Sequence, residues 1–260
     1  MLSALLAGFN RQSVEISVLH DELGASQSRM NEKPSTPQTR LRYKATWEAL
    51  ANRQEGAVMY VSGYADEEMM YATMEDTIGI LRDTVGIRPT DVVLEIGCGI
   101  GRVGRGLAHF VKEWIGCDVS SEMLRQAQRK TLGLPNVRLV EVSGHDLQPI
   151  PDASVDVVYT TVVFMHLDEW DRYAYCLEAM RVLKPGGRFY CDNANIASDE
   201  GWAMFDQVRT HFSPGERPAQ ASRCSSVPEF EAFLQRAGFV DWHVATRPMW
   251  VYGWGSKPLP

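Results

Sequence analysis

Residues 92–102 read Val-Val-Leu-Glu-Ile-Gly-Cys-Gly-Ile-Gly-Arg, an apolar run that passes through one acid into a glycine-rich turn. The glycines at 97, 99 and 101 let the backbone turn sharply and let a ligand approach bare peptide groups. A strand, such a turn and then a helix are typical of open α/β sheets, which bind ligands where their parallel strands end. The turn is therefore the predicted cofactor site.

The same stretch satisfies two motifs. Gly99 to Gly104 matches the pattern G-x-G-x-x-G, and Asp118 follows at about the 20-residue distance expected of a ribose-binding acid in nicotinamide-dependent oxidoreductases. The register favours another cofactor, because the apolar run ends at Ile96 and Glu95 stands two residues before the first glycine. A carboxylate offers a pyrophosphate nothing, whereas it attracts an ammonium or a sulfonium group in a partly dry site.

In this register the chain resembles the class I S-adenosylmethionine-dependent methyltransferases, whose first motif reads acid-x-Gly-x-Gly-x-Gly. Further stretches follow in the order of that family, between residues 85 and 245. The family's second strand, with an acid at its tip and a helix after it, resembles residues 114–124, and the end of its third strand resembles residues 142–146. The fourth strand resembles residues 155–161, and the turn into the fifth resembles residues 183–190.

The resemblance implies roles for individual residues. Asp118 would hold both ribose hydroxyls, Met123 would pack against the adenine, and Asp146 would accept a hydrogen bond from the adenine amino group. Taken singly, Asp118 is equally typical of a helix cap and Asp146 of a solvated loop. The cofactor-binding residues that the resemblance implies are Glu95, Gly97, Cys98, Gly99, Gly101, Arg102, Asp118, Val119, Met123, His145, Asp146, Thr161 and Tyr64.

The predicted fold class is α/β. We expect a Rossmann-like seven-stranded, mostly parallel sheet with an antiparallel last strand, helices on both faces and an N-terminal helical cap. The predicted divisions are a flexible N-terminal extension at 1–40, the helical cap at 41–88 and the S-adenosylmethionine-binding domain at 89–260, with an acceptor lid at about 197–227. Periodicity predicts helices at 41–53, 66–85 and 228–237 and two final strands at 240–246 and 249–252.

Composition supports a globular enzyme with a small-molecule acceptor. The 260 residues are 45% hydrophobic and carry a net charge of −7, which argues against a nucleic-acid partner. Five cysteines without C-x-x-C spacing indicate reduced thiols, no zinc site and a cytoplasmic location. The apolar start at residues 2–9 is too short to cross a membrane. We expect a monomer or a homodimer.

Two residues are predicted to be catalytic. His166 follows the fourth strand, where the family places the acceptor, and its ordinary pKa suits proton abstraction near neutrality. Asp192 follows the fifth strand together with Asn193 and Asn195, on the same rim of the sheet. These polar groups are suited to orienting a polyhydroxylated acceptor, or to binding a divalent metal that acidifies a hydroxyl, although no metal is predicted.

The first hypothesis is therefore methyl transfer from S-adenosylmethionine to a hydroxyl of a polar or glycosidic metabolite, with S-adenosylhomocysteine as the other product. A sulfonium methyl is already activated, so much of the catalysis comes from holding donor and acceptor in line. Three alternatives stay open at this point. They are an N- or C-methyltransferase, a protein that binds S-adenosylmethionine without catalysis, and a nicotinamide oxidoreductase.

Overall fold

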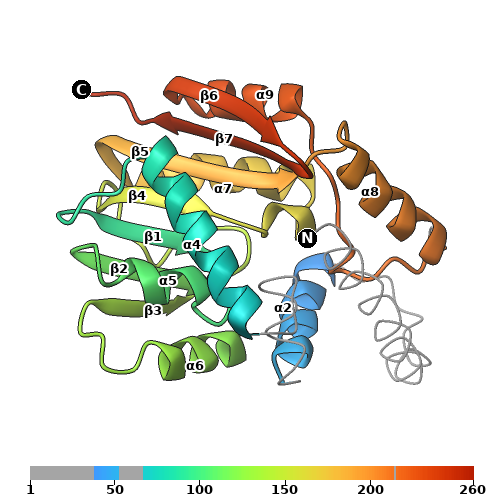
Figure 1. Ribbon diagram of the computed structural model, residues 1–260, viewed down its shortest axis with the longest axis horizontal. Helices are drawn as coiled ribbons and strands as arrows, with labels where there is room; N and C mark the ends of the chain where they lie inside the picture. Colours follow the sequence, from blue (N-terminus) through green and yellow to red (C-terminus); the bar gives the residue numbers. More distant parts are fainter. Residues whose placement is uncertain (1–37, 53–66, 214) are drawn as a thin grey trace.

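The structure, a computed structural model, describes residues 38–52, 67–213 and 215–260. In this part of the chain seven strands form one sheet in the order β3-β2-β1-β4-β5-β7-β6 (Figure 1). The strands are β1 (Val92–Ile96), β2 (Glu113–Asp118), β3 (Val137–Glu141), β4 (Val155–Thr160), β5 (Leu183–Ala194), β6 (Val240–Arg247) and β7 (Trp250–Ser256). Strands β1 to β5 are parallel, and β7 is antiparallel to both of its neighbours. The predicted Rossmann-like sheet is confirmed.

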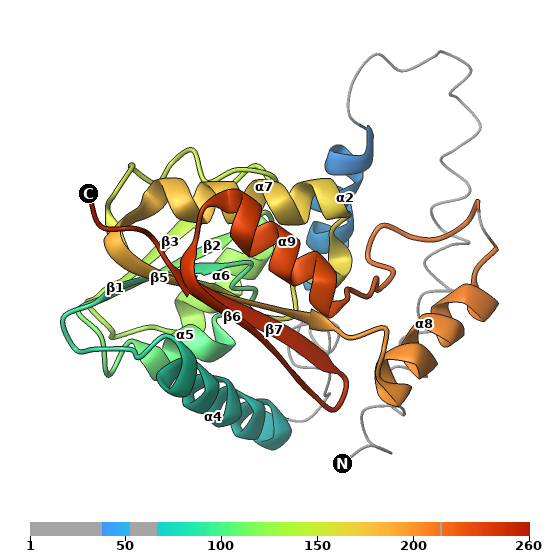
Figure 2. The same cartoon turned by 90° about the horizontal axis from the view of Figure 1, so that it is seen from above.

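Helices cover both faces of this sheet, with α4 and α5 on one side and α7 and α9 on the other (Figure 2). The helices are α2 (Gln38–Ala51), α4 (Glu67–Thr84), α5 (Arg102–Leu107), α6 (Ser121–Lys130), α7 (Glu169–Val182), α8 (Asp199–His211) and α9 (Val227–Ala237), with a 3-10 turn η2 (Phe164–His166). Val93 packs with α4 and α5, whereas Leu94 and Ile96 pack with α7 and α9. Both faces of β1 are buried, as expected of a parallel strand between two helical layers.

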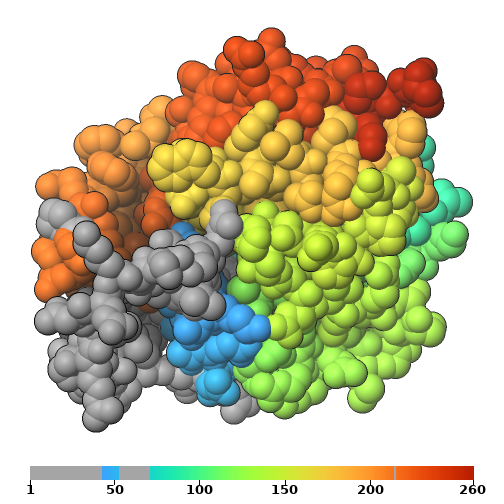
Figure 3. Space-filling model, turned by 180° about the vertical axis from the view of Figure 1, so that it is seen from behind, coloured from blue at the N-terminus to red at the C-terminus, as the bar shows by residue number. Residues whose placement is uncertain are grey.

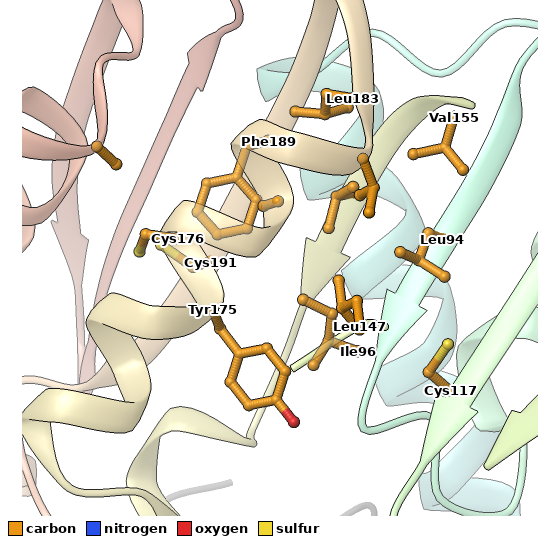
Figure 4. Close-up of a cluster of buried hydrophobic side chains, with 14 of the residues drawn as sticks. Leu94, Ile96, Cys117, Leu147, Val155, Tyr175, Cys176, Leu183, Phe189 and Cys191 are labelled. Atoms are coloured by element: carbon orange, nitrogen blue, oxygen red, sulfur yellow. The ribbon is translucent and has the colours of Figure 1, made fainter. Parts of the chain in front are cut away.

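Figure 4 shows the apolar cluster between α7 and the sheet. Leu94 and Ile96 of β1, Cys117 of β2 and Phe189 of β5 fill it, and Tyr175 of α7 lies at one end. Burying a side chain of this size contributes about 1.5–3 kcal/mol to stability. This packing fixes the strand ends, from which the loops of the site begin.

The apparent dinucleotide fingerprint ends in a glycine that serves helix packing. A Cβ atom on Gly104 would stand 2.0 Å from Cζ2 of Trp114, so α5 lies against β2 only because that atom is absent. Trp114 is fully buried, and its Nε1 donates a hydrogen bond of 3.2 Å to the hydroxyl of Tyr159. Gly104 is thus required for packing between α5 and β2.

The two helices that precede β1 occupy different places. Helix α4 packs on α5 and sends apolar side chains into the cluster of that face. Helix α2 lies against α6, where Gln126 Nε2 donates to the carbonyl oxygen of Ala51 at 2.6 Å and Lys44 pairs with Glu141. In the space-filling view of Figure 3, α2 lies in blue against the green atoms of this region. Of the described parts of the predicted cap at 41–88, which leave out residues 53–66, α2 is the one that lies beside the end of β3 and the start of α6.

The predicted lid at 197–227 contains a helix that periodicity did not indicate. Helix α8 begins after Ser198, whose hydroxyl accepts a hydrogen bond of 3.0 Å from the amide of Gly201. Met204 of α8 packs with Ala194 and Met249, which attaches the helix to the end of β5. No described helix is long and apolar enough to span a bilayer.

Candidate functional site

A cavity opens where β1, β2 and β4 end, the edge of the sheet at which open α/β folds bind ligands. Of the residues predicted to bind the cofactor or to act in catalysis, those lining it are Glu95, Gly97, Cys98, Gly99, Arg102, Asp118, Val119, Met123, Thr161 and His166. Gly101, His145, Asp146 and Asp192 do not line it. Tyr64 lies outside the described residues, so its predicted role stays a prediction.

The glycine turn has the left-handed backbone that only glycine adopts without strain. Gly97, Gly99 and Gly101 have φ angles of 69°, 52° and 77°. A Cβ atom on Gly97 would also stand 2.4 Å from Cγ2 of Val163, which lines the opposite wall. The turn after β1 and the loop after β4 therefore approach each other as closely as bare backbone allows.

Asp118 joins two backbone segments at the end of β2. One carboxylate oxygen accepts from the amide of Gly99 at 2.8 Å, and the other accepts from the amide of Ser120 at 2.9 Å. The cap of α6 is Ser120, whose hydroxyl accepts from the amide of Met123, so Asp118 is not the helix cap. Burial raises the pKa of Asp118 to about 6, although the amide hydrogen bonds lower it. Each carboxylate oxygen accepts two hydrogen bonds, so the group still has capacity for ribose hydroxyls.

Replacing Asp118 by Ala is expected to weaken donor binding by about 1.5–3 kcal/mol, the scale of hydrogen bonds to a charged group. Asn is the milder variant, because its amide oxygen still accepts from one backbone N–H. Calorimetric titration with S-adenosylhomocysteine measures both effects. Unchanged affinity in the Ala variant would refute the assignment of Asp118 to the ribose.

Glu95 is a buried carboxylate in the middle of a polar row on the α4 side of the sheet. It accepts a hydrogen bond from the hydroxyl of Tyr159, which itself accepts from Trp114. Burial raises the pKa of Glu95 to about 8, while the Tyr159 hydrogen bond and the nearby charge of Arg102 lower it. Arg102 is 6% exposed, and its Nε has no hydrogen-bond partner among the described residues. Together they offer an anionic and a cationic group to a ligand with ammonium and carboxylate ends.

Donor affinity is expected to rise with pH and to level off above about pH 8, the pKa of Glu95 in the unliganded protein. Below this value binding of an ammonium group displaces the proton of Glu95, so the affinity changes by up to about tenfold per pH unit. The ligand's own amino group titrates in every variant, so the difference between wild type and Glu95→Gln isolates Glu95. Parallel pH curves for the two proteins would contradict the assignment.

The same pKa shift has a consequence for stability. The pKa of Glu95 rises from 4.5 to about 8 on folding, so the folded protein holds the proton more tightly than the unfolded chain. This contribution to stability is complete below pH 4.5 and is lost as the pH rises to about 8.

The loop after β3 meets the cavity through Val142 and Gly144. His145 and Asp146 are turned into a surface cluster, where His145 Nε2 lies 3.1 Å from a carboxylate oxygen of Asp146. Asp146 also accepts from the amide of Gln148 at 3.2 Å. Asp146 does not line the cavity, so the adenine contact predicted for it stays a prediction.

His166, at the end of η2, faces the cavity as a neutral base. Its Nδ1 lies 2.9 Å from the carbonyl oxygen of Gln220, and because a carbonyl only accepts, Nδ1 carries the proton and Nε2 the lone pair. Burial lowers the pKa of His166 to about 4, and the charges of Arg223 and Arg172 act in the same direction, whereas the hydrogen bond to Gln220 raises it.

Asp192 has a different place from the one its predicted catalytic role requires. It is buried, and its Oδ1 accepts a hydrogen bond of 2.8 Å from the amide of Val162. Val162 has a φ of 63°, a conformation that costs a β-branched residue energy. Asp192 thus holds the turn between β4 and His166, and the structure supports a positioning role.

Helix α2 supplies functional residues that the sequence did not single out. Tyr43 and Trp47 line the cavity, and the Trp47 ring meets the His166 ring edge to face, with centroids 4.8 Å apart. Nη1 of Arg223 donates to the Tyr43 hydroxyl and to the carbonyl of His166, both at 3.2 Å. The only signal in the sequence was the amphipathic pattern of residues 41–53, which does not say which neighbour a face will meet.

Glu48, the next residue of α2, binds the start of α6. Its carboxylate accepts from the amide and the hydroxyl of Ser121 at 2.8 and 2.9 Å, and from the amide of Glu122 and the hydroxyl of Ser120 at 3.2 Å. A carboxylate at a helix N-terminus satisfies amides that have no partner within the helix. Glu48 therefore anchors α2 beside Asp118.

These residues fit the predicted methyl donor. Gly97 leaves bare backbone at the cavity, Glu95 matches an ammonium group, and Arg102, whose Nε has no partner among the described residues, matches a carboxylate. Each oxygen of Asp118 accepts one amide hydrogen bond and has a second acceptor position for a ribose hydroxyl. A pyrophosphate fits less well, because Glu95 would repel it at the mouth of the turn.

Comparison with known proteins agrees with this fit. Residues 94–191 match the model of a methyltransferase domain family. YcgJ, an uncharacterised methyltransferase of Bacillus subtilis, is 30% identical over 66% of this chain and 65% of its own length. The 27-O-demethylrifamycin SV methyltransferase of Amycolatopsis mediterranei is 28% identical over 72% of this chain and 71% of its own length. The chain spans between 39% and 65% of the length of five curated relatives, one of which is YcgJ.

Solved structures share the fold. The structure of YcgJ has a TM-score of 0.53 at 25% identity and covers 66% of this chain and 71% of its own. Phosphoethanolamine N-methyltransferase 1 of Haemonchus contortus, in complex with phosphoethanolamine and S-adenosylhomocysteine, has a TM-score of 0.65 at 18% identity and covers 85% of this chain and 49% of its own. Residues 94–191, which hold the glycine turn and Asp118, are therefore a methyltransferase domain, and the fold is that of the class I S-adenosylmethionine-dependent methyltransferases.

Proposed function

We propose that this chain transfers a methyl group from S-adenosylmethionine to a hydroxyl oxygen of a small molecule. The observation that carries the proposal is the neutral His166 on the cavity wall, with Nδ1 fixed by the carbonyl of Gln220 and the lone pair on Nε2. A hydroxyl must lose its proton as its oxygen attacks, and a positioned histidine is the usual acceptor of that proton.

S-adenosylmethionine supplies a methyl group that is already activated on a sulfonium. The protein's own part is to hold the two reactants in line, which contributes roughly 7–11 kcal/mol to lowering the barrier. The close approach of Gly97 and Val163 fixes the donor side, and the turn held by Asp192 fixes the position of His166. His166 then takes the hydroxyl proton at Nε2.

The wall beside His166 favours an acceptor with apolar or aromatic surface next to its hydroxyl. This wall consists of Tyr43 and Trp47, whose rings lie at the cavity. The amides predicted to orient a polyhydroxylated acceptor are used within the fold, because Asn193 Nδ2 donates to Ser225 at 2.7 Å and Asn195 Oδ1 accepts from the amide of Ala197 at 3.0 Å. We therefore propose that the acceptor is a hydroxyl on a less polar skeleton rather than a hydroxyl of a glycosidic metabolite. A relative named for a 27-O-demethylrifamycin substrate is consistent with it.

The N-methyltransferase alternative has support among the relatives, because the phosphoethanolamine N-methyltransferase of Triticum aestivum is 27% identical over 61% of this chain. Against it stand the charges of Arg223 and Arg172, which lower the pKa of His166 and equally repel an ammonium acceptor. A cationic amine is therefore a poorer match than a neutral hydroxyl.

A panel of acceptors with isotopically labelled donor tests the proposal. We expect label on oxygen in phenols or macrocyclic alcohols, with weaker transfer to free sugars. Label found only in amine or carbon acceptors would overturn it. Calorimetry with S-adenosylhomocysteine accompanies the assay, because binding without transfer to any class would instead support the non-catalytic alternative.

A further inference from the structure

One tyrosine hydroxyl at the cavity has no hydrogen-bond partner among the described residues. The buried tyrosines in this part of the chain are Tyr43, Tyr159, Tyr175 and Tyr190. The hydroxyls of Tyr43, Tyr159 and Tyr190 are hydrogen-bonded to Arg223, Glu95 and Asp192 respectively. Tyr175 is 3% exposed as a residue and lines the cavity. Its hydroxyl is open to the cavity and is not among the enclosed polar atoms, so it is a candidate donor to a ligand.

Tyr175 lines the cavity from helix α7. It lies on α7, packs at the end of the apolar cluster of Figure 4 and lines the cavity together with Val142 and Leu167. Its hydroxyl is directed away from Phe189 and Leu183 in that view. The ring of Tyr175 is thus held by the apolar cluster, and its hydroxyl is at the cavity.

The position of Tyr175 places it at the adenosine end of the site. Val142 and Gly144, which line the same cavity, follow β3, and Asp118 and Met123 border it at the end of β2. The charges of Asp118, Asp171 and Asp146, after the larger effect of burial, raise the pKa of Tyr175. The phenol therefore keeps its proton and acts as a hydrogen-bond donor.

We propose that the Tyr175 hydroxyl donates a hydrogen bond to a ring nitrogen of the adenine of S-adenosylmethionine and so selects for this base. The neighbouring carboxylates only accept, which suits the 6-amino group but not the ring nitrogens. Tyr175 supplies that donor from a ring that packing already holds still, so little entropy is lost on binding. The inference rests on the donor site and is independent of the acceptor chosen above.

The test compares Tyr175→Phe with wild type by calorimetry, using S-adenosylhomocysteine and its 1-deaza, 3-deaza and 7-deaza analogues. Loss of one hydrogen bond is expected to weaken S-adenosylhomocysteine binding about 2- to 10-fold in the variant. One deaza analogue should bind wild type with the same weakness, and the variant should bind this analogue and the parent compound equally.

Tyr173→Phe is the matched control. Tyr173 lies two residues away on α7, and its ring packs on Phe233 with centroids 5.6 Å apart, so its hydroxyl is not at the cavity. This variant should bind all four ligands as wild type does. The proposal is overturned if Tyr175→Phe binds S-adenosylhomocysteine like wild type. It is equally overturned if the variant weakens all four ligands by one common factor, because that pattern indicates a structural effect.

Discussion

Replacing His166 by Asn is expected to lower kcat by about 10²- to 10⁴-fold with saturating donor and hydroxyl acceptor, the usual contribution of a general base. Asn is chosen because its side-chain amide can still donate to the Gln220 carbonyl, as Nδ1 of His166 does. The variant therefore keeps the loop in place and removes only the lone pair at Nε2. Donor affinity, measured by calorimetry, should change little.

The pH profile of the wild type gives a second readout of His166. Its pKa is lowered from 6.5 to about 4, so the base stays neutral and active down to about pH 5. An ordinary histidine would instead lose most of its neutral form between pH 7 and 5.5. We expect kcat at saturating substrates to stay level over that interval. A fall centred near pH 6.5 would contradict the buried position of the ring.

The matching control for this substitution is His243→Asn. His243 lies on β6, where its ring stacks on Trp254 with centroids 5.2 Å apart, and it does not line the cavity. Its replacement should leave kcat unchanged. If His166→Asn also retains full activity with the best hydroxyl acceptor, the hydroxyl loses its proton without help from His166. The role proposed for His166 is then wrong.

Gly97→Ala is the second substitution with a large expected effect. The left-handed backbone costs a residue with a Cβ atom about 1–2 kcal/mol, and forcing that atom into Val163 adds about 1–3 kcal/mol of overpacking. We expect the free energy of unfolding to fall by roughly the sum of these costs and donor binding to be lost, because the turn must move away from the loop after β4. Chemical denaturation and calorimetric titration measure the two effects.

Gly86→Ala separates the backbone cost from the close approach. Gly86 has a φ of 62°, close to the 69° of Gly97, but no atom lies within 4 Å of a Cβ placed on it. This variant should lose only about 1–2 kcal/mol of stability and should bind the donor normally. If the two variants behave alike, contact between the turn and Val163 is not what the site requires.

Local sequence patterns predicted the donor side of this site well. The turn after β1, the acid at the end of β2 and the paired final strands all have signals within a few residues, because glycine conformations, strand ends and capping are local properties. The glycine that ends α9 shows the same, since Gly238 has the left-handed φ of 91° that such a position favours.

The acceptor side could not be predicted in the same way. Tyr43 and Trp47 reach the cavity because α2 packs on α6 in one particular orientation, and a helical pattern does not specify its neighbour. Asp192 shows the converse. A strand end on the correct rim suggested a catalytic carboxylate, but the strained turn at Val162 takes its hydrogen bond. A polar side chain is available to a ligand only if no backbone group elsewhere in the fold takes its hydrogen bonds, and a local pattern does not show this.

Helix α2 lines one wall of the cavity with side chains that take no part in the hydrogen bonds anchoring it to α6. Tyr43 and Trp47 are four residues apart and share one face at the cavity, whereas Glu48 fastens the helix to α6 through backbone and hydroxyl groups. A substitution of Trp47 therefore changes the surface that this wall offers to a ligand and leaves the hydrogen bonds between Glu48 and the start of α6 in place.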